Sequence, residues 1–258
     1  MENKILGILK KELKFSLNTE IFEEAVSTND YCKNLAKSSK EDALVIALSQ
    51  TGGKGRLGRS FFSPKESGIY LSFLLHPNLN ADQCAKITTA AAVAAAQAID
   101  FVSGKKSYIK WVNDIYLDGK KVAGILTEAG FSGNNAKVQY AVMGIGVNLF
   151  DPIGGFPDDI KDKAGSVFGK LLPNAELTVK FIKEFVKYFL DIYSILPDTL
   201  YMENYKSRSM LIGKKVYFIK NGIKISGLVL GIDNDARLLL STDNGSMTLN
   251  AGEVSINM

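Results

Sequence analysis

Two segments of the chain combine residue types that suit anion binding. The first, QTGGKGRLGR at residues 50–59, contains four glycines together with Lys54, Arg56 and Arg59. Glycines let the backbone turn tightly and approach a ligand closely, while the cations offer charge to a phosphate or carboxylate. The spacing does not match GxxxxGK[ST]. Residues 53–58 fit GxGxxG in spacing, but the segment lies between two strand-like runs and not between a strand and a helix, so it is not the dinucleotide-binding loop. The segment therefore predicts either an anion-binding loop or a solvated basic turn, and composition alone does not choose between them.

The second segment is KWVNDIYL at residues 110–117, followed by GKKVAGILTE at residues 119–128. It places Lys110 and Lys121 beside apolar runs and puts the pair Asn113-Asp114 at a bend. From the residues alone, Lys121 reads as an ordinary hairpin lysine, and Trp111, the chain's only tryptophan, reads as a core aromatic.

The sequence has too few histidines and cysteines to favour a catalytic nucleophile or a zinc site. It contains one histidine, His76, and two cysteines, Cys32 and Cys84, with no CxxC spacing. No Ser/His or Cys/His pair is recognisable, and a zinc site is improbable with so few ligands. Two cysteines also form no disulfide framework, which fits a reducing cytoplasm.

Several elements must position these residues. The Ser27-Thr28-Asn29 run predicts a helix N-terminus, and this is the first helix that we expect. Apolar runs predict strands, and three longer segments predict helices. The expected strands are 43–49, 69–75, 108–112, 122–128 and 139–149, and the expected helices are 81–102, 177–193 and 197–206. The short connections predict a mostly antiparallel meander.

The residue pattern of the sequence changes near Ser209. From Leu211 onward, short β-type runs alternate with the turn pairs Asn221-Gly222, Asp233-Asn234 and Asn244-Gly245. This pattern is typical of a small barrel of about five strands. We therefore expect two domains, residues 1–208 and residues 209–258, in an α+β chain.

Composition limits the class of protein. The chain has 258 residues, a formal net charge of +4 and 46% apolar residues, which is enough for a core and excludes disorder. The charge balance does not by itself indicate a nucleic-acid partner. The longest uninterrupted apolar run is residues 90–96, so we expect no membrane span, and no secretory signal is visible.

At this point the motifs resemble those of a known family. GKGRLGRSFFSP resembles the GRGRxGRxW loop of biotin protein ligases, and KWVNDIYL…KKVAGILTE resembles their KWPNDIYL…KKxGGILxE segment. Ser27-Thr28-Asn29-Asp30 and the segment GIGVN at residues 144–148 also stand in the family's order. The C-terminal β-rich segment is similar to the family's SH3-like domain, so the resemblance covers most of the chain.

The resemblance implies a fold and an activity. The fold is a class II synthetase-like catalytic domain, with a mixed, mostly antiparallel sheet flanked by helices, followed by an SH3-like barrel. The activity is formation of biotinyl-5′-AMP from biotin and ATP, with Mg²⁺, and transfer of biotin to a lysine of a biotin carboxyl carrier protein. Fixed cations and backbone donors would lower the barrier of the first step, without an enzyme nucleophile.

The resemblance also implies roles for individual residues. Lys121, Arg56 and Lys110 would be catalytic, and Asp114 is a weaker candidate, as metal ligand or acceptor for the incoming amine. The implied biotin-binding residues are Ser27, Thr28, Gln50, Gly53, Lys54, Lys121, Gly124 and Gly144. The implied residues for ATP and the adenylate are Arg56, Arg59, Phe61, Lys110, Asn113 and Asn148.

Three positions depart from the family pattern. Lys54 stands where arginine is usual, and lysine lacks arginine's planar fork. Val112 stands where proline is usual, and Phe61 where the aromatic residue near the adenine is usually tryptophan.

Other functions remain open on the sequence. A lipoate or octanoate ligase or transferase shares the fold class, although the two-part basic signature favours biotin. A biotin-responsive repressor would need a DNA-binding domain, and the 26 residues before Ser27 are too few for one, so sequence-specific DNA binding is not expected. A nucleotide-binding module without catalysis is the third alternative. Edge strands could pair with the acceptor or with a second copy of the chain.

Overall fold

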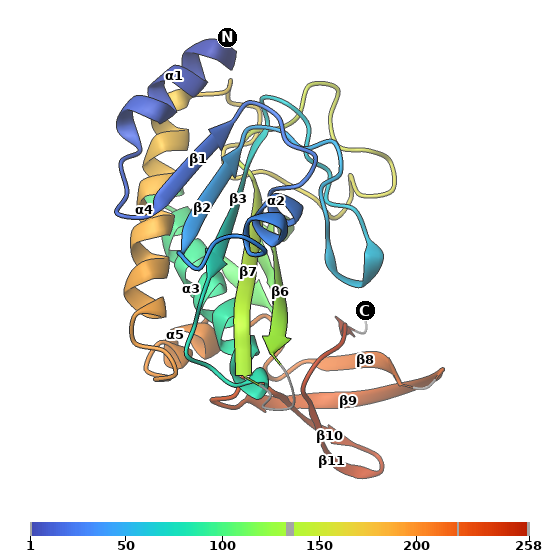
Figure 1. Cartoon of the computed structure of the whole chain (residues 1–258). Coiled ribbons are helices and arrows are strands. Elements are labelled where there is room, and N and C mark those ends of the chain that lie inside the picture. The colour runs from blue at the N-terminus through green and yellow to red at the C-terminus, as the bar shows by residue number, and fades with distance from the viewer. Residues whose placement is uncertain (1, 133–136, 221, 257–258) are drawn as a thin grey trace.

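A seven-stranded sheet forms the centre of the molecule, seen here in a computed structural model that describes residues 2–132, 137–220 and 222–256 (Figure 1). The strand order is β1-β2-β3-β7-β6-β5-β4. The strands are β1 (Asn18–Phe22), β2 (Ala43–Ala47), β3 (Gly68–Leu75), β4 (Tyr108–Lys110), β5 (Asp114–Leu117), β6 (Lys120–Ser132) and β7 (Lys137–Asn148). The β1–β2 pair is parallel and the other neighbouring pairs are antiparallel, so the predicted mixed, mostly antiparallel sheet is confirmed.

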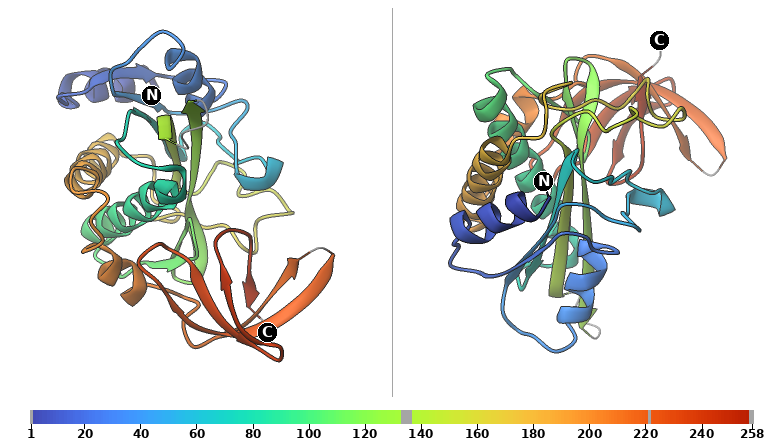
Figure 2. Two further views of the ribbon diagram at one scale, coloured as in Figure 1. Left: turned by 60° about the horizontal axis from the view of Figure 1, so that its bottom comes forward. Right: turned by 90° about the horizontal axis from the view of Figure 1, so that it is seen from above.

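Helices cover the two faces of this sheet unequally. The long helices α3 (Cys84–Ser103) and α4 (Ala175–Tyr193) lie on one face, and α2 (Thr28–Leu35) lies on the other, as Figure 2 shows in its right-hand view. α1 (Glu2–Glu12) packs against α4, and α5 (Met202–Ser207) packs against α3. The face that carries α2 is therefore the more open one.

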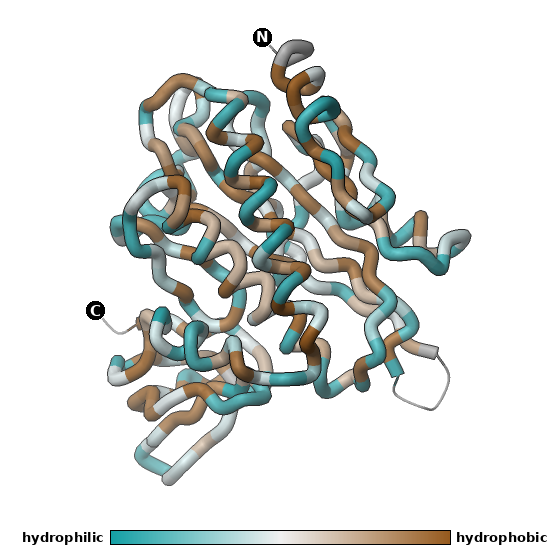
Figure 3. Tube along the Cα trace, turned by 90° about the vertical axis from the view of Figure 1, so that its left-hand side faces the viewer, coloured by the Kyte–Doolittle hydropathy of each residue, from teal (hydrophilic) through white to brown (hydrophobic). Residues whose placement is uncertain are grey.

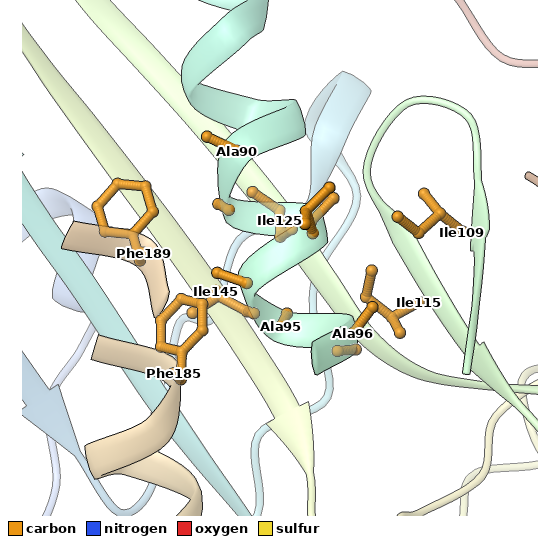
Figure 4. Close-up of a cluster of buried hydrophobic side chains, with 14 of the residues drawn as sticks. Ala90, Ala95, Ala96, Ile109, Ile115, Ile125, Ile145, Phe185 and Phe189 are labelled. Carbon is orange, nitrogen blue, oxygen red and sulfur yellow. The ribbon is translucent and has the colours of Figure 1, made fainter. Parts of the chain in front are cut away.

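α3 and α4 form the core with the covered face of the sheet. Hydrophilic and hydrophobic residues alternate along α4 in Figure 3, as expected for a helix with one buried face. Phe181, Phe185 and Phe189 lie one turn apart on that face and stack on one another. In Figure 4, Phe185 and Phe189 lie beside alanines of α3 and isoleucines of the sheet. Burying each such phenylalanine contributes about 1.5–3 kcal/mol.

α3 is unusual in its run of small side chains. Residues 90–96 are all alanine except Val93, and all seven are buried. Small side chains let a helix lie close to its neighbours. Together with the short 3₁₀ turn η2 (Ala81–Gln83), α3 is long and apolar enough to cross a membrane, but 72% of its most apolar window is buried inside the protein. It is the core helix of this fold.

A second, five-stranded antiparallel sheet follows α5 (Figure 1). Its order is β11-β10-β9-β8-β12, and its strands are β8 (Lys215–Lys220), β9 (Ile223–Ile232), β10 (Leu238–Thr242), β11 (Gly245–Leu249) and β12 (Ser255–Ile256). Turns lie at two of the predicted pairs, Asp233-Asn234 and Asn244-Gly245. In the third predicted pair, Asn221 lies outside the described residues.

Two elements near the N-terminus were missed by the sequence reading. The expected first helix at Ser27 is the second, because α1 precedes it and buries Leu9 against the core. β1 was also missed, because this short edge strand is only partly buried and so lacks a continuous apolar run.

Two boundaries were also predicted wrongly. The helix expected at 197–206 begins only at Met202, because Pro197 lies among successive turns that follow α4. The strand expected at 108–112 ends at Lys110, where the chain turns and begins β5 at Asp114.

Trp111 connects the two sheets. Its indole is buried, and its Nε1 donates a 2.7 Å hydrogen bond to the carbonyl oxygen of Ala236, between β9 and β10. The interpretation of Trp111 as a core aromatic is confirmed. Nearby, Lys86 of α3 lies 3.4 Å from Asp235, so the same corner is also held by charge.

Replacing the indole should weaken this junction. We expect Trp111→Phe to lower the free energy of unfolding by about 1–3 kcal/mol, since the buried carbonyl of Ala236 loses its donor. Urea denaturation measures this effect, and Tyr217→Phe, in β8, is a control that keeps the indole bond. A Trp111→Phe protein as stable as the wild type would show that the bond contributes nothing.

Candidate active site

The open face of the sheet carries two paired glycines, Gly124 of β6 and Gly146 of β7, which we call the glycine lane. Antiparallel pairing sets Tyr70 of β3 opposite Gly146 of β7, and Gly146 opposite Gly124 of β6. The aromatic ring of Phe61 occupies the space above these glycines: a Cβ atom added at Gly146 would lie 2.6 Å from it, and one added at Gly124 would lie 3.2 Å from it. The absence of side chains therefore leaves room for a ring on the sheet.

The N-terminus of α2 forms a polar wall beside this lane. Ser27 caps the helix by accepting a hydrogen bond from the backbone N–H of Asp30, as the sequence predicted. The backbone N–H of Thr28 donates to Oε1 of Gln50 at 2.9 Å. Gln50 in turn donates through Nε2 to the hydroxyl of Ser63 at 3.2 Å. Polar groups from α2 and from the chain after β2 thus meet at one end of the pocket.

The cation Lys54 is held at this wall by a carboxylate. Its Nζ lies 2.7 Å from Asp30, which also pairs with Lys33 at 2.9 Å. Burial opposes ionisation of Asp30, but the hydrogen bonds and charges of Lys54 and Lys33 outweigh it and hold the pKa of Asp30 below its ordinary value of 3.8.

The glycine-rich segment folds back on itself as a narrow loop. Lys54 and Ser60 form an antiparallel bridge, and the N–H of Gly55 donates to the carbonyl of Arg59 at 2.7 Å. At the tip, the exposed Leu57 adopts a left-handed conformation with φ of 56°. This conformation is costly for a branched side chain, so the tip is strained.

Both arginines of the loop contact the segment before β12. Arg56 donates to the carbonyl of Gly252 at 3.0 Å and to Oδ1 of Asn113 at 2.8 Å. Arg59 forms an ion pair with Glu253 at 2.7 Å. Figure 1 shows the loop and the C-terminal end of the chain close together, although the residues are far apart in sequence. The hydrogen bond from Arg59 is the main cause that lowers the pKa of Glu253 below 4.5.

A β-bulge turns Lys121 toward the pocket. β5 pairs Asp114 with Gly124 and Ile115 with Ala123, but Tyr116 with Lys121, so one residue of β6 is extra. Val122 and Ala123 consequently both lie in the core, and Lys121 lines the pocket.

Asp114 faces Lys121 across this bend. Asp114 Oδ1 lies 2.8 Å from Lys121 Nζ, an ion pair by distance, yet no donor in the described part of the chain is aligned with that buried oxygen as a hydrogen bond. Lys110 and Asn113 line the pocket next to this pair. Asn113 is held from behind, since its Nδ2 donates to the carbonyl of Ile125 at 2.9 Å.

Most of the residues predicted for the site line one pocket. They are Ser27, Thr28, Gln50, Lys54, Arg56, Arg59, Phe61, Lys110, Asn113, Asp114, Lys121, Gly124 and Gly144. Two are not part of its lining. Gly53 lies beneath Phe61 and accepts that residue's N–H, while Asn148 ends β7 and donates to the carbonyl of Gly165 at 3.0 Å. The space above Gly144 is filled by the side chain of Asn29.

Sequence reasoning did not assign a role to several residues at this site. Asn29 stood in a motif, and Ser72 was a lone polar residue in the apolar run of β3, which is a usable signal. Glu253 carried no local signal, because its partner Arg59 is 194 residues away.

The geometry suits an anionic ligand that also has a neutral polar end. Five cations surround the pocket: Lys54, Arg56, Arg59, Lys110 and Lys121. The hydroxyl and amide groups of Thr28 and Gln50 line the polar wall, next to the ion pair of Lys54 with Asp30. No group of three metal-ligating side chains occurs in residues 2–132, 137–220 and 222–256, so a metal here would need ligands from a substrate.

Comparisons with known proteins agree on one family. Residues 22–148 match the biotin/lipoate A/B protein ligase family, and residues 211–256 match the biotin protein ligase C terminal domain. A bifunctional ligase/repressor BirA from Bacillus spizizenii is 30% identical, over 96% of this chain and 78% of its own length. A biotin–[acetyl-CoA-carboxylase] ligase from Paracoccus denitrificans is also 30% identical, over 88% of this chain and 96% of its own.

Solved structures give the same result. A biotin protein ligase from Aquifex aeolicus in complex with biotin and ATP superposes with a TM-score of 0.71 at 26% identity, covering 94% of this chain and 99% of that one.

The contact between Arg59 and Glu253 predicts a pH effect. Because Arg59 lowers the pKa of Glu253 below 4.5, this contact stabilises the fold at pH values above 4.5 and is lost as the pH falls through the lowered value. We expect Arg59→Ala to move the Glu253 titration midpoint upward, toward 4.5. Carboxyl ¹³C NMR measures this midpoint.

A matched control is Arg237→Ala, which removes an ion pair with Asp233 in the same small sheet. It should leave the Glu253 midpoint where it is. A Glu253 midpoint that does not move in Arg59→Ala would show that the ion pair does not persist in solution.

Proposed function

The chain belongs to the biotin protein ligase family, and from that premise we propose that it joins biotin to ATP as biotinyl-5′-AMP and then transfers biotin to a lysine of a biotin carboxyl carrier protein. The observation that carries this proposal is the pocket's two-ended character. Thr28 and Gln50 offer neutral polar groups at one end, where Thr28 contacts Ser72 opposite Gly144, and Lys121 lies at the other end beside Gly124. The arginines of the loop line the same pocket.

The polar end suits the ureido ring of biotin. Ser27, Thr28 and Gln50 offer hydroxyl and amide groups to its N–H and C=O groups, with the backbone at Gly53 and Lys54 on the carboxylate side. Gly124 gives room for the bicyclic ring, and the side chain of Asn29 borders it above Gly144. A ring buried with paired hydrogen bonds is discriminated strongly from analogues that lack them.

The basic end suits the adenylation step. An oxygen of the biotin carboxylate attacks the α-phosphorus of ATP, the bond from that phosphorus to the bridging oxygen breaks, and pyrophosphate leaves with the electron pair. Both reactants are anions, so fixed positive charge lowers the barrier. We assign Lys121 to the carboxylate, Lys110 to the α-phosphate, and Arg56 and Arg59 to the phosphates.

Other residues hold the nucleotide. We assign Phe61 to contact with the adenine, and Asn113 and Asn148 to orienting the nucleotide. Asn148 would act indirectly, by holding the segment around Gly165 in place, because its Nδ2 donates a hydrogen bond to the carbonyl of Gly165.

A magnesium ion fits the site as a companion of the triphosphate. Asp114 lines the pocket, and its carboxylate, which lies 2.8 Å from Lys121 Nζ, would be the protein ligand. When bound, Mg²⁺ neutralises phosphate charge, and it commonly needs only one or two carboxylates from the protein.

In the second step, the ε-amine of the carrier lysine attacks the carbonyl carbon of biotinyl-5′-AMP. An amide bond forms, AMP leaves, and the amine loses a proton. Asp114 is the carboxylate nearest to Lys121 and is our candidate to receive it. The loop that carries Arg56 stands over the glycine lane, where it would shield the adenylate from water.

Two broader assignments accompany this proposal. The chain divides at 208/209 into a catalytic domain and a small β-domain, in keeping with the end of α5 at Ser207 and the start of the second sheet at β8. The reaction takes place in the cytoplasm, in keeping with two cysteines that are both free.

Lipoate is the alternative substrate within the same fold class. Its dithiolane ring has neither N–H nor C=O groups, so it would leave Thr28 and Gln50 facing an apolar ring. Buried polar groups without partners are costly, which favours biotin.

The direct test is a mass measurement of a biotin carboxyl carrier domain after incubation with the protein, ATP, Mg²⁺ and either biotin or lipoate. We expect one biotin added through an amide and no lipoate. An unmodified carrier in the biotin reaction, or a lipoylated carrier, would contradict the assignment.

Lys121 can be tested in the first step alone. We expect Lys121→Ala to slow biotin-dependent ATP–pyrophosphate exchange by about 10²–10³-fold, the usual effect of removing one charge-stabilising group. Lys120→Ala is the matched control, because the neighbouring Lys120 binds the carbonyl of Asp162 outside the pocket. Near-normal exchange in Lys121→Ala would remove Lys121 from the catalytic residues.

A further inference from the structure

A chain of hydrogen bonds runs from the pocket wall, between α2 and the open face of the sheet, to a surface ion pair. The hydroxyl of Thr28 lies 2.7 Å from that of Ser72, which is fully buried. Ser72 Oγ lies 2.7 Å from Oδ1 of Asn29, and Nδ2 of Asn29 lies 2.9 Å from Oε2 of Glu128. The other carboxylate oxygen of Glu128 lies 2.9 Å from Nζ of Lys33. Glu128 and Lys33 are not part of the pocket lining.

The outer end of this chain fixes the orientation of the Asn29 carboxamide. The nitrogen faces two acceptors, the carboxylate of Glu128 and the carbonyl of Leu126 at 3.4 Å. A flipped amide would place its oxygen against both of them. The oxygen of Asn29 must therefore point inward, over Gly144, which has no side chain to obstruct it.

At the inner end, the hydrogen bonds among Asn29, Ser72 and Thr28 then run in one direction. Ser72 has a single hydroxyl hydrogen, and Oδ1 of Asn29 can only accept, so that hydrogen must go to Asn29. The oxygen of Ser72, at 2.7 Å, is then a closer acceptor for the hydroxyl hydrogen of Thr28 than Oε1 of Gln50, at 3.1 Å. The opposite direction would set the lone pairs of Ser72 and Asn29 against each other at 2.7 Å.

This arrangement leaves Thr28 Oγ1 as an acceptor on its pocket side. Its oxygen lies 3.1 Å from Oε1 of Gln50, which already accepts the backbone N–H of Thr28. With the Thr28 hydrogen committed to Ser72, two acceptor oxygens stand side by side at the pocket wall. A ligand N–H satisfies them, whereas a ligand oxygen placed there repels both.

We propose that Glu128, acting through Asn29 and Ser72, sets the hydrogen-bond polarity of Thr28 and so makes the pocket select a ligand that presents an N–H group at this point. The inference rests on the proposed function, in which that group is a ureido N–H of biotin. Glu128, Asn29 and Ser72 are positioning residues, because they act through Thr28, and Lys33 fixes the position of the Glu128 carboxylate through their ion pair.

The test is substrate discrimination in Glu128→Gln. A glutamine side chain can donate as well as accept, so the Asn29 carboxamide is free to flip and Thr28 is free to donate. The probes are biotin and its two cyclic carbamate analogues, in which one or the other ureido N–H is replaced by oxygen. The analogue whose oxygen faces Thr28 should be rejected by the wild type, and the other analogue serves as an internal reference.

We expect Glu128→Gln to weaken biotin binding about tenfold and to reduce the discrimination against that analogue about tenfold or more, in line with the loss of one buried hydrogen bond. The KM for ATP should stay unchanged, which a general loss of structure would not allow. Glu12→Gln is the matched control: it removes a surface ion pair, Glu12 with Lys183 at 3.2 Å, far from the pocket.

A second variant, Ser72→Ala, breaks the same chain at its buried link. It should also reduce the discrimination, because the Thr28 hydrogen loses its acceptor and can turn toward the ligand. Thermal melting shows whether each variant is folded, and calorimetric titration gives the dissociation constants.

The outcomes separate the two proposals. Failure of the wild type to bind biotin overturns the proposed function and the inference with it. A wild type that binds biotin, with folded Glu128→Gln and Ser72→Ala proteins that discriminate as it does, overturns only the role of Glu128. Reduced discrimination in both variants, with Glu12→Gln unchanged, supports it.

Discussion

Mutual repulsion among the cations of one pocket is the constraint on which this structure depends. Five positive side chains gathered around one pocket must each be held in place when no phosphate is present. Carboxylates from three separate parts of the chain do this for three of the five. Asp30 holds Lys54, Asp114 faces Lys121, and Glu253 pairs with Arg59. The folded chain therefore carries carboxylates at points where anionic substrates would bring their own charge.

The position of the small sheet explains how Glu253 reaches the pocket. Glu253 belongs to the segment before β12, and it reaches the pocket only because the second sheet packs against the first through Trp111 and Lys86. The ion pair itself is exposed, so it contributes little to stability, whereas the buried bond of Trp111 contributes more. Packing at one corner thus sets the position of a charge at another.

The sequence predicted the polar and basic groups of the site but not the geometry that unites them. Spacing and residue type identified the glycine-rich loop, the Ser27 cap and the antiparallel meander, because these depend on local chemistry. The bulge that turns Lys121 inward was not predictable, since one extra residue in a strand leaves the apolar run of β6 intact. Glu253 was missed for a different reason: long-range ion pairs leave no trace in local periodicity.

Phe61 occupies space in the pocket that a ligand would need. Its ring lies on the glycine lane, in edge contact with Tyr70, and the loop that carries it is tied to the C-terminal segment through Arg56 and Arg59. A ring bound over Gly124 and Gly146 would compete with Phe61 for the same space, and a phosphate beside Arg59 would compete with Glu253. Phe61 and Arg59 belong to the same loop, so a ligand at either place would change the contacts of that loop. The left-handed backbone of Leu57 strains the tip of this loop, and the contacts of Arg56 and Arg59 offset that strain. A change of loop conformation would relieve it.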